Sequence, residues 1–222
     1  QSTTWALSAA EEAAGLTSSD ISDSRYYYCN VLRYGAAGDG STDDTAAIQN
    51  AINVAAISFG AGGAIVTAPA GTYLGNWTIK SGVIIRGDGA ATKFIPVTNA
   101  PVFTTTTSGV STVRIGREDC FIYGNAGFAA QDGIFLGTSA GFAIDTVHLK
   151  RVRIENCGRY GLRAVGAAVS STYIQRLHAE HSIMLNNVNC GISLTGACLE
   201  STFVNIFVIK NGGTAGTNAN CE

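Results

Sequence analysis

The chain has 222 residues, of which 46% are hydrophobic and only 14% are charged, with 27 glycines and 3 prolines. Globular domains typically carry about 25% charged residues, so this composition indicates a turn-rich β fold with a sizeable core rather than a helical bundle. The formal net charge of −2, without any run of Lys and Arg, argues against nucleic acid as a partner. No apolar stretch approaches the ~18 residues of a membrane-spanning helix, so we expect no membrane insertion.

The first element in chain order is an N-terminal segment, residues 1–30. Trp5, Leu7 and Leu16 are loosely spaced as in a helix, and a Ser/Thr/Asp-rich stretch after Gly15 ends it. We predict a short connecting helix here, which acts as a linker or as a packing or oligomer contact. The main domain is predicted to span residues 31–222.

An α-helix is predicted over residues 43–58, after an extended stretch at 25–40. Ile48, Ile52 and Ala55 recur at helical spacing and would form its buried face. Three glycines, at positions 60, 62 and 63, would end it. From there to the C-terminus no further helix is indicated.

The motif before this helix, "GDGSTDD", is interpreted as a turn and helix cap. It lacks the lysine of a phosphate-binding loop, and Asn50 stands where an EF-hand counted from Asp39 needs its twelfth-position Glu. Glycines open backbone angles closed to other residues, and Thr and Asp side chains cap helix amides. We assign these structural roles to Gly38, Asp39, Gly40, Thr42, Asp43 and Asp44. A cation bound by the three aspartates is the alternative.

After Gly63 the sequence alternates apolar with polar or small residues and turns on glycine. Four segments align, each with an asparagine two residues after a strand residue, and they are 31, 31 and 24 residues apart: Asn125, Asn156, Asn187 and Asn211. An inward apolar column is predicted from Val152/Ile154, Ile183/Leu185 and Phe207/Ile209. A β-sandwich would need tight hairpins every 8–12 residues, which are missing. The repeat favours the stacked coils of a parallel β-helix.

Three consecutive pieces resemble the pectate-lyase-like family: "VLRYGAAGDGSTDDTAAIQNAINVA" (31–55), "GGAIVTAPAGTY" (62–73) and "IKSGVIIRGDG" (79–89). Within this family, the order of the N-terminal segment and the glycine–aspartate motif most resembles that of bacteriophage tailspikes and tail-fibre depolymerases. The resemblance implies an all-β, right-handed parallel β-helix (solenoid) with an N-terminal capping α-helix. It also implies a homotrimer in a virion tail, assembled in the host cytoplasm and acting outside, that contacts bacterial surface polysaccharide and other phage tail proteins.

Candidate site residues lie on the outward positions of the later coils. Glycoside hydrolysis needs two carboxylates ~5–9.5 Å apart, and Glu155 and Glu180 are the candidates. A lyase needs a base near the sugar C5 atom and a cation on the sugar carboxylate, so His178 or Tyr160 is paired with Arg153 or Arg159. The competing interpretation is that these residues serve solubility alone. We predict no cofactor and no metal.

The favoured function is a tailspike-type protein that binds, and in its enzymatic form depolymerises, a bacterial surface polysaccharide. The alternatives are a non-catalytic attachment module of a tail particle and a free polysaccharide lyase or glycoside hydrolase. The six cysteines show no metal-binding spacing, so we expect mostly reduced, core-facing thiols. No end-cap follows the last coil, so we expect the chain to be a fragment of a longer protein.

Overall fold

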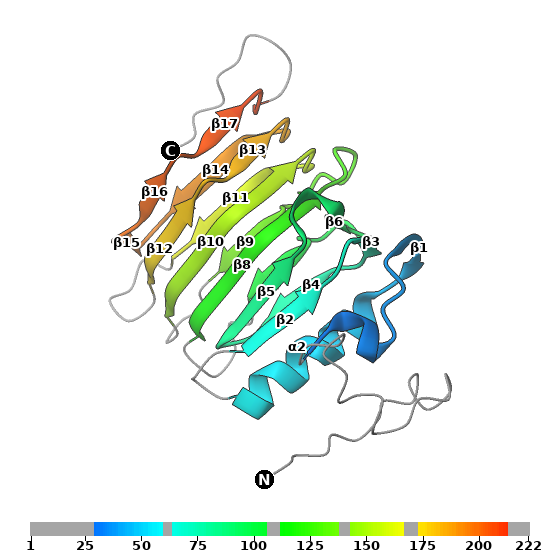
Figure 1. The fold of residues 1–222 in the computed structure, drawn as a ribbon. Coiled ribbons are helices and arrows are strands. Elements are labelled where there is room, and N and C mark those ends of the chain that lie inside the picture. Colours follow the sequence, from blue (N-terminus) through cyan, green and yellow to red (C-terminus); the bar gives the residue numbers. More distant parts are fainter. Residues whose placement is uncertain (1–28, 60–63, 106–111, 138–142, 167–172, 213–222) are drawn as a thin grey trace, which may run out of the picture.

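All strand pairs within the described residues are parallel. The structure is a computed structural model, and it describes residues 29–59, 64–105, 112–137, 143–166 and 173–212. Successive strands stack into a ladder that climbs from the N-terminal to the C-terminal coils (Figure 1). The prediction of a right-handed parallel β-helix with one capping helix is therefore confirmed.

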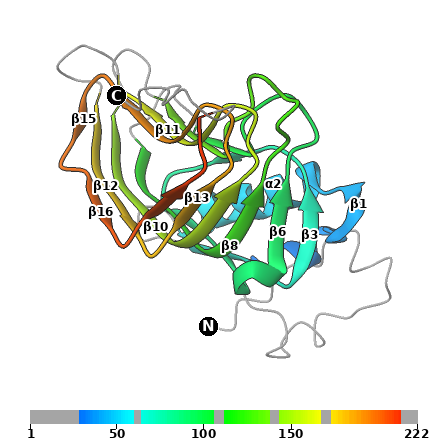
Figure 2. The same ribbon diagram turned by 90° about the horizontal axis from the view of Figure 1, so that it is seen from above.

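Two sheets form the sides of the coils. The long sheet contains β1 (Asp39–Asp43), β2 (Ala64–Ala68), β3 (Gly71–Leu74), β5 (Val83–Gly87), β6 (Thr92–Ile95), β8 (Thr112–Tyr123), β10 (Ile144–Glu155), β12 (Ile174–Glu180), β13 (Ile183–Leu185), β15 (Cys198–Leu199), β16 (Thr202–Val204) and β17 (Phe207–Ile209). The five-stranded sheet contains β4 (Trp77–Ile79), β7 (Phe103–Thr105), β9 (Ile134–Gly137), β11 (Tyr160–Val165) and β14 (Cys190–Thr195). Figure 2 shows the same coils from above.

The helix α2 (Thr45–Phe59) lies at the N-terminal end of the ladder (Figure 1). Ile48, Ile52 and Ala55 are buried, as their spacing predicts. The helix begins two residues later than predicted, because residues up to Asp43 extend as β1. Two short 3-10 helices, η2 (Val31–Tyr34) and η4 (Gly89–Ala91), complete the described elements. The predicted N-terminal connecting helix lies outside the described residues.

The glycine–aspartate motif forms a hydrogen-bonded turn. The Asp39 carboxylate accepts the Ser41 and Thr42 N–H groups, each at 2.8 Å, and Asp43 accepts the first helical N–H, that of Thr45, at 2.9 Å. The buried Asp44 accepts the N–H groups of residues 37 and 38 and so closes the loop. Gly38 has φ +62°, and a Cβ there would lie 2.8 Å from the Tyr73 ring, so this position needs glycine. These aspartates are occupied by the turn itself.

The core is a column of inward-facing side chains. Near the helix it is aromatic: Trp77, Phe94 and Phe103 are buried, with ring centroids 5.1–5.4 Å apart. Of the described cysteines, Cys29, Cys120, Cys157 and Cys198 are free thiols, and burial raises the pKa of Cys157 to about 12. Cys190 is disulfide-bonded and is the exception among the described cysteines, for which mostly reduced thiols were expected. Within the described residues, no helix is long and apolar enough to cross a membrane.

The predicted alignment of the coils is one residue out of register in one coil. Glu155 pairs with Tyr123 and Leu185, so Asn125, Asn187 and Asn211 share a column with Cys157 rather than with Asn156. The inward column therefore continues from Ile154 to Met184, which is buried. The prediction that Ile183, Leu185, Phe207 and Ile209 point inward is wrong. A one-residue shift of register turns each side chain to the other face of the sheet.

A repeated bend sets this register. Asp119, Arg151, His181 and Asn205 each adopt a left-handed backbone conformation, with φ between 49° and 51°. They occupy equivalent positions in successive coils, so every coil turns at the same place. The bend divides the long sheet into a part before it, with β2, β5 and β12, and a part after it, with β3, β6, β13 and β17; β8 and β10 run through both.

Candidate functional site

A pocket of about 280 Å³ opens on the five-stranded sheet. Its lining combines two aromatic side chains, two threonines, an amide and a guanidinium with small apolar residues: Asn76, Trp77, Thr78, Ala100, Pro101, Thr104, Phe135 and Arg159. Thr78, Thr104 and Phe135 pair in register across β4, β7 and β9, and the same row continues to Arg163 on β11. Their inward neighbours are buried, so alternation places this row on the outer face. A mixed apolar and polar lining of this kind suits a sugar.

Arg159, one of the predicted substrate-binding residues, lines this pocket but is held by an internal partner. Its guanidinium donates to both carboxylate oxygens of Asp132, at 2.8 Å from Nε and 2.6 Å from Nη2. The Asp132 side chain is fully buried, whereas the Arg159 side chain is 26% exposed. The hydrogen bonds to Asp132 raise the pKa of Arg159 above its usual value. This pair fixes the loop before β11 to the coil beneath it.

Tyr160, the second predicted residue here, has two guanidinium groups near its ring. The guanidinium carbons of Arg159 and Arg163 are each 5.6 Å from its ring centroid. Arg163 is also 5.2 Å from the Phe135 ring. Among the residues that the structure describes, Arg163 forms no ion pair with a carboxylate. Arg163 and Tyr160 do not line the pocket themselves. Arg163 lies beside Phe135, which does, and offers a cation that a ligand carboxylate can use.

Arg153 and Glu155 lie elsewhere, on the outer face of the long sheet. They form an ion pair at 2.6 Å, and the Arg153 guanidinium lies 4.9 Å from the Phe121 ring. Phe121 on β8 pairs in register with Arg153 on β10 and, at the other edge of β8, with Lys93 on β6. The Lys93 Nζ is 5.1 Å from the centroid of the Phe121 ring. Phe121 is almost fully covered between the two cations. This arrangement packs the surface tightly and leaves no open platform on Phe121.

Glu155 and Glu180 are not brought together. Glu180 pairs in register with Lys150, and Glu155 is five residues further along β10. At about 3.3 Å per strand residue, the two positions are roughly 16 Å apart along the chain, on opposite sides of the bend. Each carboxylate is paired with its own cation, Glu155 with Arg153 and Glu180 with Lys150. The two-carboxylate hypothesis therefore has no support in the register.

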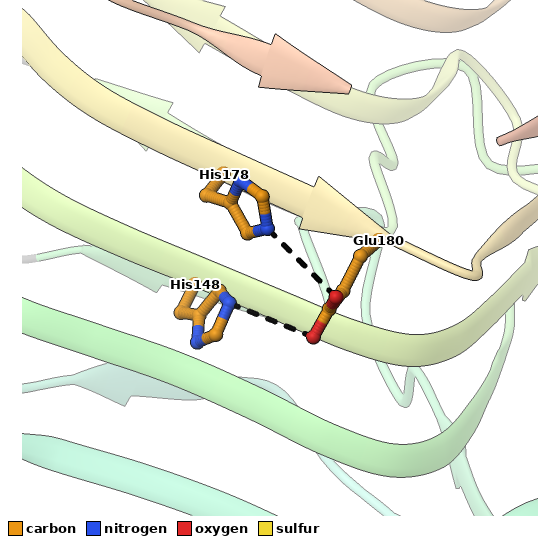
Figure 3. A group of neighbouring side chains, drawn as sticks. All are labelled: His148, His178 and Glu180. Atoms are coloured by element: carbon orange, nitrogen blue, oxygen red, sulfur yellow. Dashed lines mark ion pairs between the residues drawn. The ribbon is translucent and has the colours of Figure 1, made fainter. Parts of the chain in front are cut away.

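His178 and Glu180 do lie together, in a group that we call the histidine cluster: His148, Lys150, His178, Glu180 and His181. Lys150 Nζ donates to Glu180 Oε1 at 2.9 Å and, with the nearby imidazoles, holds the pKa of Glu180 below its usual value. His148 Nε2 is 3.9 Å from Oε1, and His178 Nε2 is 3.9 Å from Oε2 (Figure 3). The cluster is on the outer face of the long sheet, away from the pocket.

Sequence reasoning missed the partners that complete both groups. Asp132 is 27 residues from Arg159, and His148 is 30 residues from His178. Only the coil register makes them neighbours. In the sequence, each partner could be found only as an oppositely charged or metal-binding residue about one coil length away. Such a search works only when the register of the coils is known.

Comparison with known proteins identifies the family. A model of the family described as rhamnogalacturonase A/epimerase, pectate lyase-like, matches residues 28–151. The chain belongs to this family. The resemblance of its entry motif to pectate-lyase-like proteins is thereby confirmed. Arg159 and Tyr160 lie beyond the matched residues.

Curated relatives include mannuronan C5-epimerase AlgE3 of Azotobacter vinelandii, 37% identical over 150 residues, which cover 60% of this chain and 8% of the relative. Alginate lyase 7 of the same organism is 34% identical over 149 residues, covering 59% of this chain and 17% of the relative. The chain thus spans less than a fifth of the length of either relative. Both proteins are named for polysaccharides.

Solved structures of similar fold include the tailspike gp49 of Acinetobacter baumannii bacteriophage Fri1, a capsular polysaccharide depolymerase. Its TM-score to this chain is 0.60 at 14% identity, over 89% of this chain and 39% of the tailspike. At that identity the likeness shows the fold. The family of pectate-lyase-like β-helices therefore contains proteins that act on polysaccharides, and a phage tailspike shares the coil architecture.

Proposed function

We propose that this β-helix recognises a uronate-containing bacterial surface polysaccharide in the pocket of the five-stranded sheet. One observation carries the proposal: two guanidiniums lie near the Tyr160 ring, and one of them, that of Arg163, has no carboxylate partner among the described residues. A uronate carboxylate would bind Arg163 through paired N–H donors. Phe135 and the threonine hydroxyls would contact the sugar ring. The names of the alginate-related relatives support the choice of a uronate.

The chemistry that these residues favour is proton abstraction at C5. The Tyr160 oxygen accepts the C5 proton, and the electron pair left behind forms a C4=C5 double bond as the C4–O4 bond breaks. The departing O4 oxygen takes up the proton that the Tyr160 hydroxyl carried, so the phenol ends the step holding the C5 proton in its place. Arg163 stabilises the negative charge that develops on the uronate carboxylate. We therefore favour elimination over hydrolysis, for which the predicted carboxylate pair is not brought together.

The setting proposed for this activity is a phage tailspike. The fold is shared with gp49, a tailspike, and the proposal includes a homotrimer located in the virion tail, in contact with other tail proteins and with the host polysaccharide. Light scattering on the purified chain tests the assembly: we expect a trimer, and a monomer at all concentrations would contradict it.

An oligosaccharide assay tests the function. The protein is incubated with a panel of bacterial capsular and uronate polysaccharides, and both ultraviolet absorbance of the new double bond and reducing ends are followed. We expect both signals to rise on a uronate substrate and Tyr160→Phe to abolish them while binding persists. Reducing ends without the absorbance would indicate a hydrolase, and binding without either signal would indicate an attachment module.

A further inference from the structure

The histidine cluster has the composition and spacing of a metal site. His148 on β10 and His178 on β12 are register partners, with ring centroids 4.9 Å apart. Glu180 follows His178 by two residues and therefore projects from the same face. One possible ligand atom from each of the three residues lies within 4.8 Å of the other two. Figure 3 shows the carboxylate to one side of the two imidazole rings, with an ion-pair line to each.

The framework that holds these side chains is rigid. β10 and β12 pair in parallel at six register positions, from Ile144 with Ile174 to Lys150 with Glu180, and all three residues lie on these strands. Inward neighbours Leu149, Leu177 and Ala179 are fully buried in the core. No loop has to close to bring the three groups together. A site built on strands in this way is more precise than one on loops.

Lys150 orients the carboxylate. Its ammonium group, at 2.9 Å, occupies Oε1, so Oε2 is the oxygen that remains for another cation. Carboxylates that bind metals are commonly held by such a second hydrogen bond. Glutamate side chains are ionised at neutral pH. An ionised carboxylate is the form that binds a metal.

We propose that His148, His178 and Glu180 bind a divalent transition-metal ion of the zinc type. Two imidazole nitrogens and one carboxylate oxygen are the donor set of zinc sites with an open fourth position, whereas Ca²⁺ and Mg²⁺ prefer oxygen donors alone. Ligand atoms ~2.1 Å from a tetrahedral zinc lie roughly 3.4 Å from one another. His178 Nε2 is 3.9 Å from Glu180 Oε2, and the ligand atoms of all three residues lie within 4.8 Å of one another, so side-chain rotations close the site. The bound ion would link two successive coils.

His181 provides a matched control. Its Nδ1 is 3.7 Å from Glu180 Oε2, but it lies on the bend of the coil, and its Nε2 contacts the Asn205 side-chain nitrogen at 3.2 Å. It therefore shares the cluster's charge environment but is absent from the three-residue ligand set. These are the three histidines of the chain, so each can be replaced alone.

Calorimetric titration of the purified chain with Zn²⁺ near neutral pH tests the proposal. We expect one saturable site, weakened at least tenfold by His148→Ala, His178→Ala or Glu180→Gln, and unchanged within about threefold by His181→Ala. Co²⁺ at the same site should give a visible d–d absorption band that Zn²⁺ displaces, and circular dichroism should show all variants folded. Absence of saturable Zn²⁺ binding, or an equal loss in His181→Ala, overturns the assignment. The pocket is on the other sheet, so polysaccharide binding is a separate readout.

Discussion

The ion pair between Arg159 and Asp132 makes a quantitative prediction about which arginine near the pocket supports the fold. In Arg159→Ala, the fully buried Asp132 carboxylate loses two N–H donors and keeps one, the Tyr160 N–H at 3.3 Å. Removing one partner of a buried pair typically costs about 3–5 kcal/mol. Because the Arg159 side chain is 26% exposed, water reaches one side of the pair, and we expect the lower limit, about 3 kcal/mol.

Urea unfolding measures this cost. With a slope of about 3 kcal/mol per molar, the midpoint should fall by about 1 M. The matched control is Arg163→Ala, which removes two ring contacts and no described ion pair, and should cost about 1 kcal/mol or less. Adding Asp132→Asn to Arg159→Ala should recover part of the loss, because no buried charge remains. Equal urea midpoints for Arg159→Ala and Arg163→Ala would refute a stabilising role of the Arg159–Asp132 pair. The prediction that Arg159 binds substrate would then be the role left for it.

Two further predictions concern the stacked coils. In Lys150→Met, the pKa of Glu180 should rise towards its ordinary ~4.3, measured by carbon-detected NMR titration, while Arg86→Met, which frees Glu118 instead, should leave it unchanged. Because the pKa of Glu180 is lower in the folded than in the unfolded chain, the Lys150–Glu180 pair stabilises the fold at pH values above the unfolded-state pKa. This stabilisation is lost as the pH falls through the folded-state pKa, so Lys150→Met should make the unfolding free energy less sensitive to acid. Asn187→Ala leaves the buried Cys157 N–H without its 3.0 Å acceptor, so unfolding free energy should fall by about 1–3 kcal/mol, and a loss under 0.5 kcal/mol would contradict the role of this amide.

The architecture was predictable because it depends on local patterns. The glycine–aspartate motif, the buried face of Ile48, Ile52 and Ala55, and the alternating texture after Gly63 each act over a few residues. Such patterns specify a turn, a helix face or a strand without knowledge of distant contacts. With the coil repeat they favoured a parallel β-helix, and the resemblance to pectate-lyase-like proteins added the capping role of the helix.

The register was not predictable in the same way. Successive coils differ in length, and the left-handed bends at Arg151 and His181 decide which residue of each coil faces inward. Aligning Asn156 with Asn187 therefore misplaced Leu185, although the coil itself was correctly recognised. The consequences reach the site: the neighbours of His178 and of Arg159 come from one coil earlier, so their chemistry depends on the register.

Binding of a uronate oligosaccharide at the five-stranded sheet is the central claim, and calorimetry with an oligomannuronate tests it most directly. The control ligand is a neutral glucan of equal length. The control variant is Lys93→Ala, which removes a cation that also contacts two aromatic rings but lies on the long sheet. The account predicts that the uronate alone binds, that Arg163→Ala weakens it at least tenfold, consistent with loss of a charged hydrogen-bond pair of about 1.5–3 kcal/mol, and that Lys93→Ala leaves it unchanged. Loss of binding in Lys93→Ala with full binding in Arg163→Ala would contradict the account.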